Sequence, residues 1–130
     1  MLRTVYREKY FSASHRIRNY NGKCENPHGH NWKVRVYVSS KTLDETGFVI
    51  DFKLLDSIME TIMSDLDHKD LNTVPPFDSE LNPTAENIAE YLFLKAEKEL
   101  GKIRKNLLIS RVMVWESHKS CAVIESDFNE

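Results

Sequence analysis

The segment Asn31-Trp-Lys-Val-Arg-Val-Tyr-Val-Ser39 alternates apolar and polar side chains more regularly than any other part of the chain. A period of two is typical of a β-strand that buries one face and exposes the other. The aromatic and charged residues of 2–12 predict a second strand before it. Because a polar loop with Gly22 and Pro27 separates the two strands, we expect them to pair as an antiparallel hairpin.

The remainder of the chain predicts two helices and two more strands. Apolar residues recur at helical spacing after Asp51, to about residue 66, and again after Thr84, to residue 100; both residues suit an N-cap. Residues 107–116 and 121–125 predict strands. The order ββααββ favours an α+β fold, a four-stranded antiparallel sheet with both helices on one face. Since the other face would stay uncovered, we expect an oligomer.

Length and composition indicate one domain, residues 1–130, with 41% hydrophobic and 29% charged residues. The formal net charge of −2 gives no overall attraction to nucleic acid or to membrane surfaces. The polar N-terminus does not resemble a secretory signal, and no apolar run is long enough to span a membrane. We therefore expect a cytoplasmic protein whose two cysteines, Cys24 and Cys121, are free thiols.

Three of the five histidines lie within residues 15–30, which indicates a metal site. If His28 and His30 begin a strand, their imidazoles share a face, and antiparallel pairing brings His15 beside them. Three imidazoles with one open position are typical of catalytic zinc. Cys24 is either a fourth ligand that closes the site or a thiolate that takes part in catalysis.

Two acidic positions have both an ordinary and a functional interpretation. Asp67 and His68 open the long aperiodic segment 67–83, and are either a helix-end cluster or an acid and an imidazole for proton transfer. Glu116 ends a hydrophobic strand, where its carboxylate either meets water or holds a planar cationic group through two hydrogen bonds. His118 is interpreted as a turn residue exposed to water.

Six motifs, in order along nearly the whole chain, resemble the 6-pyruvoyl-tetrahydropterin synthase and 6-carboxy-tetrahydropterin synthase superfamily. They are Phe11-Ser-Ala-Ser-His15, Cys24-x-x-x-His28-Gly-His30, Gly47-Phe-Val-Ile-Asp-Phe52, Leu66-Asp-His-Lys-Asp-Leu-Asn72, Asn82-Pro-Thr-Ala-Glu-Asn87 and Val114-Trp-Glu116. The short spacing between Cys24 and His28 is more similar to the bacterial 6-carboxy-tetrahydropterin synthases of queuosine biosynthesis.

The resemblance implies a tunnelling fold, in which protomers join their sheets into a barrel and two trimers stack as a homohexamer. It implies Zn²⁺ on His15, His28 and His30. It implies a proton-transfer group, assembled across a subunit boundary, of Cys24, Asp67 and His68. It also implies that the pterin ring is bound by Glu116, with Thr84 at the pterin pocket.

The implied substrate is 7,8-dihydroneopterin triphosphate, converted to 6-carboxy-5,6,7,8-tetrahydropterin with release of acetaldehyde and triphosphate. The cationic candidates for the triphosphate are Arg16, Arg18, Lys23, Lys69 and Lys119. Three alternatives stay open at this point. They are a 6-pyruvoyl-tetrahydropterin synthase that only eliminates triphosphate, a non-catalytic zinc module closed by Cys24, and a pterin-binding protein without chemistry. The presence of Cys24 together with Asp67 and His68 argues against the last of these.

Overall fold

The computed structural model of the chain describes residues 1–20 and 26–127. Strands β1 (Arg3–His15) and β2 (His28–Ser40) form a long hairpin, which is followed by helix α1 (Phe52–Met63). Strand β3 (Lys69–Asp70) and the 3₁₀ helix η2 (Leu71–Thr73) lead to helix α2 (Ala85–Leu100), and then to β4 (Leu108–Ser117) and β5 (Ser120–Glu125). Within the described residues, no helix has the length and apolar character needed to cross a membrane.

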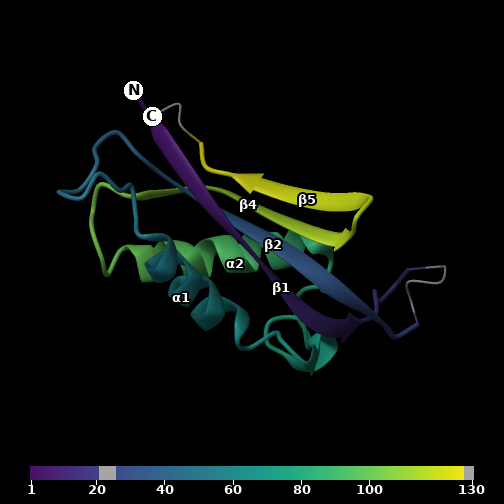
Figure 1. Cartoon of the computed structure of the whole chain (residues 1–130). Coiled ribbons are helices and arrows are strands. Elements are labelled where there is room, and N and C mark those ends of the chain that lie inside the picture. The colour runs from purple at the N-terminus through teal and green to yellow at the C-terminus, as the bar shows by residue number, and fades with distance from the viewer. Residues whose placement is uncertain (21–25, 128–130) are drawn as a thin grey trace.

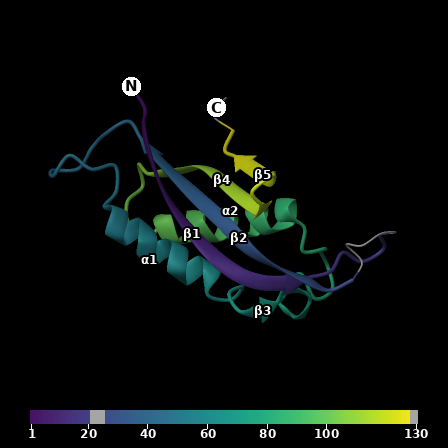
Figure 2. The ribbon, with the colours of Figure 1, turned by 45° about the vertical axis from the view of Figure 1, so that its right-hand side comes forward.

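The sheet has five strands in the order β3-β1-β2-β4-β5 (Figure 1), so the predicted four-stranded antiparallel sheet is wrong in this respect. The four long strands are antiparallel, but β3 pairs with Ala13 and Ser14 of β1 in parallel. The added strand forms because the backbone N–H and carbonyl of Ser12 point away from β2 and are free to bond on the outer side of β1. Its N–H donates to the Asp67 carboxylate at 3.0 Å, and its carbonyl accepts from the His68 N–H at 2.6 Å. Figure 2 shows β3 beside the end of β1.

Both helices cover the same face of the sheet, as predicted (Figure 1). The alternating residues of β2 that face them are fully buried, from Trp32 to Val38. α1 packs on β1 and on α2, and α2 packs on β4 and β5. The predicted N-caps are also confirmed, because the side chain of Asp51 accepts from the N–H of Lys53 and that of Thr84 from the N–H of Asn87.

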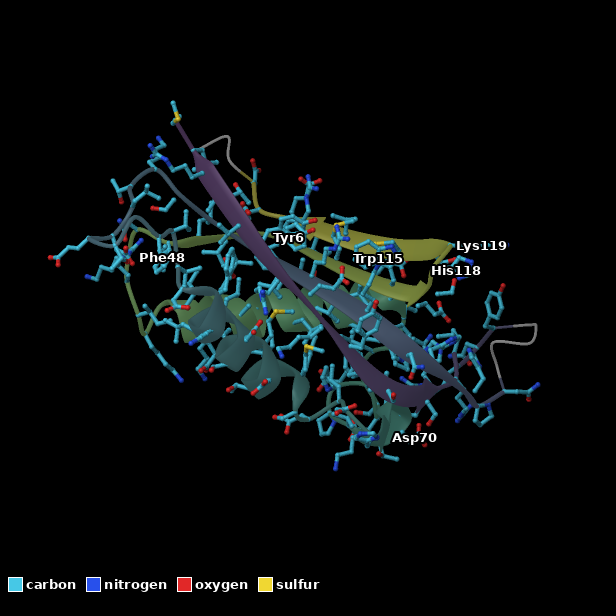
Figure 3. The ribbon with its side chains drawn as sticks, viewed as in Figure 1. Tyr6, Phe48, Asp70, Trp115, His118 and Lys119 are labelled. Atoms are coloured by element: carbon cyan, nitrogen blue, oxygen red, sulfur yellow. The ribbon has the colours of Figure 1, made fainter. Side chains whose placement is uncertain are left out.

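The opposite face of the sheet is uncovered within the described residues and carries cations beside aromatic rings. The Lys33 Nζ lies 4.2 Å from the centroid of the Trp115 ring, and the guanidinium of Arg35 lies 4.7 Å from that of Tyr6. Figure 3 labels Tyr6 and Trp115 on this face. Such contacts stabilise partly exposed charges, but they leave the aromatic surface open to a partner.

Element boundaries differ from the prediction mainly at the hairpin end. Both strands continue to the histidines, so that His15 is directly opposite His28 and the strand pairing predicted for them is confirmed. α1 ends at Met63 rather than near residue 66, because tight turns occupy residues 64–68. The turn between β4 and β5 is shorter than predicted, since both flanking serines belong to the strands.

Candidate functional site

Three imidazoles and one carboxylate converge on the helix-covered face, at the end of the β1–β2 hairpin. His15 is opposite His28, and His30 is opposite Ala13, so the period of two directs all three imidazoles to one side. Glu116 reaches the same place from β4, which is the next strand of the sheet. One ligand atom from each of His15, His28, His30 and Glu116 lies within 4.8 Å of all the others.

Backbone carbonyls determine which nitrogen of two of these imidazoles carries the proton. The Nδ1 of His15 lies 2.7 Å from the carbonyl oxygen of Pro83, and the Nδ1 of His28 lies 2.8 Å from that of Asn26. A carbonyl only accepts, so each Nδ1–H donates, and in the neutral imidazole each Nε2 keeps its lone pair. The Nε2 of His15 also lies 3.2 Å from the Glu116 Oε1, a second electron-rich atom. The two Nε2 atoms are 3.0 Å apart. Lone pairs at that distance repel each other unless a cation or a proton lies between them.

The third imidazole, His30, has an orphaned nitrogen. Its Nε2 is buried and lies 3.0 Å from Glu116 Oε1 without the geometry of a hydrogen bond to it or to any other described group. Burial lowers the pKa of His30, and the neighbouring His15 and His28 lower it further, while Glu116 opposes the shift. A neutral imidazole is the form that binds a metal. The four residues therefore fit a metal cation, since zinc and related transition metals accept imidazole and carboxylate ligands.

The position of Glu116 was not anticipated. Its Oε1 lies 3.2 Å from His15 Nε2 and 3.9 Å from His28 Nε2. The resemblance implies that this carboxylate binds the pterin ring, and in the structure it also lies against the histidines. The signal was available, because Glu116 follows Val114 by two residues and so shares the face of that buried strand position. The carboxylate is thus within reach of both a bound cation and a substrate bound beside it.

Asp67 and His68 lie at the outer edge of β1, on the other side of that strand from β2. Asp67 uses one carboxylate oxygen for the Ser12 N–H, and the other lies 3.6 Å from the Nε2 of His68. The His68 side chain is 81% exposed, and its backbone has a φ of 59°, in the left-handed region. A non-glycine residue there is strained, and such strain clusters at functional sites.

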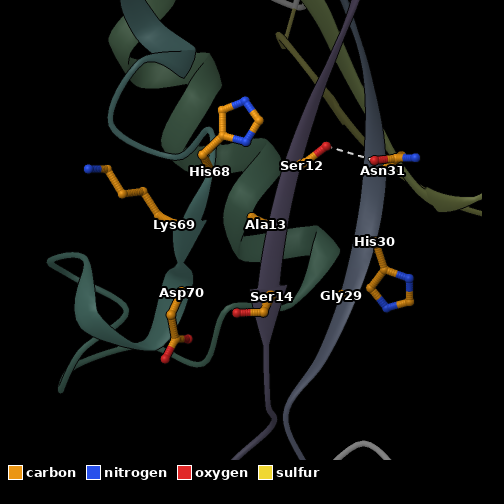
Figure 4. Close-up of a pocket in the computed structure, with 9 residues that line it drawn as sticks. All are labelled: Ser12, Ala13, Ser14, Gly29, His30, Asn31, His68, Lys69 and Asp70. Carbon is orange, nitrogen blue, oxygen red and sulfur yellow. Dashed lines mark hydrogen bonds between the residues drawn. The ribbon is translucent and has the colours of Figure 1, made fainter.

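A surface pocket of about 540 Å³ lies across the ends of β1, β2 and β3. Its lining residues are Ser12, Ala13, Ser14, Gly29, His30, Asn31, His68, Lys69 and Asp70. Figure 4 shows His68 and His30 on opposite sides of β1, with the hydroxyl of Ser12 donating to Asn31 at 2.7 Å between them. Within one chain the Asp67–His68 pair is therefore separated from the histidine cluster by a strand.

The remaining predicted residues are dispersed. Cys24 and Lys23 lie outside the described residues. Thr84 is half-buried, and its hydroxyl caps α2. Figure 3 shows His118 and Lys119 in the exposed turn between β4 and β5.

The basic residues after β1 make different contacts. The guanidinium of Arg18 donates to the carbonyls of Phe77 and Leu81, so backbone acceptors already occupy it. Lys69 lines the pocket, and Arg16 is exposed. Among the predicted phosphate-binding residues that the structure describes, Lys69 and Arg16 therefore stay accessible on this side.

Two asparagines that hold the segment after β1 were not anticipated from the sequence. The side-chain amide of Asn72 pairs with the backbone N–H and carbonyl of Arg16, at 2.8 and 3.1 Å. Asn82 pairs with Arg18 in the same way, at 2.9 and 3.1 Å. These amides replace a missing strand partner just beyond His15. Both asparagines belong to motifs that were noted, but a motif alone does not reveal which backbone it contacts.

Comparison with known proteins agrees with this architecture. A 6-carboxy-5,6,7,8-tetrahydropterin synthase of Synechocystis is 38% identical, over 72% of this chain and 74% of its own. A human 6-pyruvoyl tetrahydrobiopterin synthase is 34% identical, over 95% of this chain and 91% of its own. The structure of a Caenorhabditis elegans 6-pyruvoyl tetrahydropterin synthase superposes with a TM-score of 0.83 at 25% identity, covering 98% of this chain and 97% of that one.

The family model described as 6-pyruvoyl tetrahydropterin synthase matches residues 4–127. This range contains every described strand and helix, apart from the first residue of β1. The predicted resemblance is therefore confirmed, and the chain belongs to the 6-pyruvoyl tetrahydropterin synthase family.

Proposed function

We propose that the protein is a zinc-dependent lyase that converts 7,8-dihydroneopterin triphosphate to 6-carboxy-5,6,7,8-tetrahydropterin, releasing acetaldehyde and triphosphate in the pathway to queuosine. The observation that carries this proposal is the convergence of three imidazoles, whose ligand nitrogens lie within 4.8 Å of one another, in a chain of this family. The Synechocystis relative supports the carboxy product, as does the spacing of three residues between Cys24 and His28.

In this proposal, His15, His28 and His30 hold the ion. Once bound, zinc supplies Lewis acidity that polarises the hydroxyl groups of the substrate side chain.

Side chains of the protein bind the pterin ring and transfer the protons. The carboxylate of Glu116 accepts two N–H bonds from the edge of the pterin ring, which fixes its orientation. The Cys24 thiolate removes a proton from the substrate side chain, and the imidazole of His68 returns one. Asp67 orients that imidazole, and Thr84 lies beside the ring. The proposal also includes the cytoplasm, where the reducing environment keeps a thiol of this kind free of disulfides.

The proposal also includes a homohexamer made of two trimers. Two features support it. Most of the outer edge of β1 and the outer edge of β5 have no strand partner within the described residues, and joining such edges would close a barrel. The separation of His68 from His30 by β1 in one chain supports a site that a neighbouring copy completes (Figure 4).

A second candidate is a 6-pyruvoyl-tetrahydropterin synthase, which eliminates triphosphate without breaking the side chain. The human relative favours it, because the similarity extends over nearly the whole chain. The two candidates share substrate, metal and site residues, so they differ only in their products.

Incubation of the zinc-loaded protein with 7,8-dihydroneopterin triphosphate separates the two candidates. We expect acetaldehyde, trapped as its hydrazone, together with a carboxylated pterin identified by mass spectrometry. A pyruvoyl product without acetaldehyde would establish the second candidate. Binding of the pterin with no turnover, by protein that carries a full complement of zinc, would contradict both.

A further inference from the structure

The carbonyl that contacts His15 belongs to a three-residue turn in front of α2. The N–H of Thr84 donates to the carbonyl of Asn82 at 2.9 Å, which closes a turn around Pro83. The proline ring fixes φ at this central position. The carbonyl of Pro83 is left outside the turn and reaches the Nδ1 of His15 at 2.7 Å, where both residues are buried.

Two asparagine side chains hold this turn, each through hydrogen bonds to a different part of the chain. From α2, the Nδ2 of Asn87 donates to the carbonyl of Asn82 at 2.9 Å. From the turn itself, the side chain of Asn82 pairs with both backbone groups of Arg18, three residues after His15. The orientation of the Pro83 peptide therefore depends on a helix and on the segment that follows β1, and not on His15 alone.

We propose that Asn87 is a positioning residue for the metal ligand His15. By holding the Asn82 carbonyl, its side-chain amide aims the Pro83 carbonyl at His15 Nδ1 and so selects the tautomer whose Nε2 lone pair faces His28 and His30. The inference rests on the metal site of the proposed function. Groups that hold the second nitrogen of a ligand histidine typically change metal affinity by about 10- to 100-fold.

Asn87 is the residue through which this arrangement can be tested. A backbone carbonyl cannot be removed by substitution, whereas the side chain of Asn87 can. Asn87→Asp preserves the size of the side chain and the backbone N–H that Thr84 caps at 3.1 Å. An acidic side chain in the first turn of α2 is favourable to the helix dipole, so the helix is not expected to weaken. The added negative charge attracts cations, so any loss of zinc affinity must come from the changed contact with the Asn82 carbonyl, where an accepting oxygen replaces the N–H donor.

The test measures zinc affinity of the metal-free protein by competition with a chromogenic chelator. We expect Asn87→Asp to bind zinc about tenfold more weakly or worse. Asn87→Gln retains an amide donor and is expected to recover at least part of the affinity. Asn106→Asp is the matched control, because the amide of Asn106 donates to Thr42 in loops at the opposite end of β2 and its loss should leave zinc binding unchanged.

A second measurement is independent of the metal. Long-range ¹H–¹⁵N correlation spectra of the metal-free protein, at a pH where its imidazoles are neutral, report the tautomer of His15. We expect the Nδ1–H form in the unsubstituted chain and in Asn106→Asp, and its depletion in Asn87→Asp.

The outcomes are distinguishable. Unchanged zinc affinity in Asn87→Asp overturns the inference, and so does a loss of affinity with the His15 tautomer preserved, or an equal loss in Asn106→Asp or Asn87→Gln. If the unsubstituted protein binds no zinc, the metal part of the proposed function fails. The tautomer spectra still decide whether Asn87 positions His15.

Discussion

At the scale of the residue, the arrangement of the histidine cluster depends on the hydrogen bonds that the imidazole nitrogens make. His15 and His28 give their Nδ1 protons to carbonyls, so their Nε2 lone pairs face each other at 3.0 Å. The buried Nε2 of His30 lies 3.0 Å from the Glu116 carboxylate but makes no hydrogen bond of good geometry to any group in the described residues. The nitrogen atoms of the cluster are therefore arranged for a cation in the metal-free protein. Loss of one imidazole should weaken metal binding.

Replacement of His28 by alanine tests the ligand set. His28→Ala removes one of three imidazoles, and we expect zinc content to fall from roughly one ion per chain to a small fraction of it. Metal analysis after gel filtration measures the ratio. His118→Ala is the control, since His118 is an exposed turn residue outside the cluster (Figure 3). Full zinc occupancy in His28→Ala would show that the ligands were wrongly assigned.

Replacement of Cys24 by alanine separates catalysis from structural zinc binding. If the thiol transfers protons, Cys24→Ala retains its zinc and its thermal transition but loses turnover by about 10²-fold or more. If the thiol closes a structural site, zinc and folding are lost together. Cys121→Ala is the matched control, because this free cysteine is exposed on β5. Zinc loss in Cys24→Ala alone would favour the non-catalytic module.

The sequence predicted the side chains of the cluster better than the groups that orient them. His15, His28 and His30 were identifiable because strand periodicity directs them to one face. The carbonyls of Pro83 and Asn26 were not, since every residue has a carbonyl and only the folded backbone shows where it points. The roles of Cys24, Asp67, His68 and Thr84 stay predictions.

At the scale of the element, β1 is tied to α1 by a two-point ion pair. The guanidinium of Arg7 donates to both carboxylate oxygens of Asp56, at 2.8 and 2.9 Å. These bonds, with the positive charge of Arg7, hold the pKa of Asp56 below its usual 3.8. A carboxyl whose folded pKa is lowered stabilises the fold fully above pH 3.8, and that contribution is lost as the pH falls through the folded pKa.

Asp56→Asn should therefore reduce the free energy of unfolding near neutral pH by a few tenths to about 1 kcal/mol, as for a partly exposed pair. The difference between variant and unsubstituted protein should shrink as the pH falls below 3.8, and urea titrations at several pH values measure it. Asp65→Asn is a suitable comparison, because its carboxylate makes a longer contact of 3.7 Å with Lys95. A difference that grows on acidification would contradict the sign of the pKa shift.

The helices and long strands, whose apolar residues repeat at a regular spacing, were predicted from the sequence. The short strand without such a repeat was not. The caps at Asp51 and Thr84, and both amphipathic helices, were predicted from spacing. β3 was missed because two residues cannot display a period, and because its pairing with β1 follows from the contacts of Ser12 with Asp67 and His68, which the sequence pattern does not reveal.

At the scale of the whole molecule, the sheet has one face and two edges left open within the described residues. Ser12 points its N–H and carbonyl away from β2, so the alternation of the strand directs those of Tyr10 the same way. Tyr10 is 63% exposed and is a suitable place to test whether this edge pairs with another copy.

Tyr10→Pro removes an outward N–H while leaving the pairing of β1 with β2 intact, since proline is tolerated at strand edges. Light scattering after gel filtration should give about six times the 15.2 kDa of one chain for the unsubstituted protein. We expect a smaller mass for Tyr10→Pro, and the original mass for Tyr10→Ala, which retains the N–H. An unsubstituted chain that elutes as a monomer would contradict the proposed barrel.

The direct opposition of His15 and His28 has a consequence for the segment that joins them. An ion shared by these two side chains adds a side-chain link at the point where the pairing of β1 with β2 already joins the two ends of residues 16–27. Closing a loop has an entropy cost that grows with the logarithm of its length, and the strand pairing already carries that cost here. Cys24 precedes the ligand His28 by four residues in the sequence. Because a nearby cation lowers the pKa of a thiol, removal of the ion by a chelator should change the rate at which alkylating reagents consume Cys24.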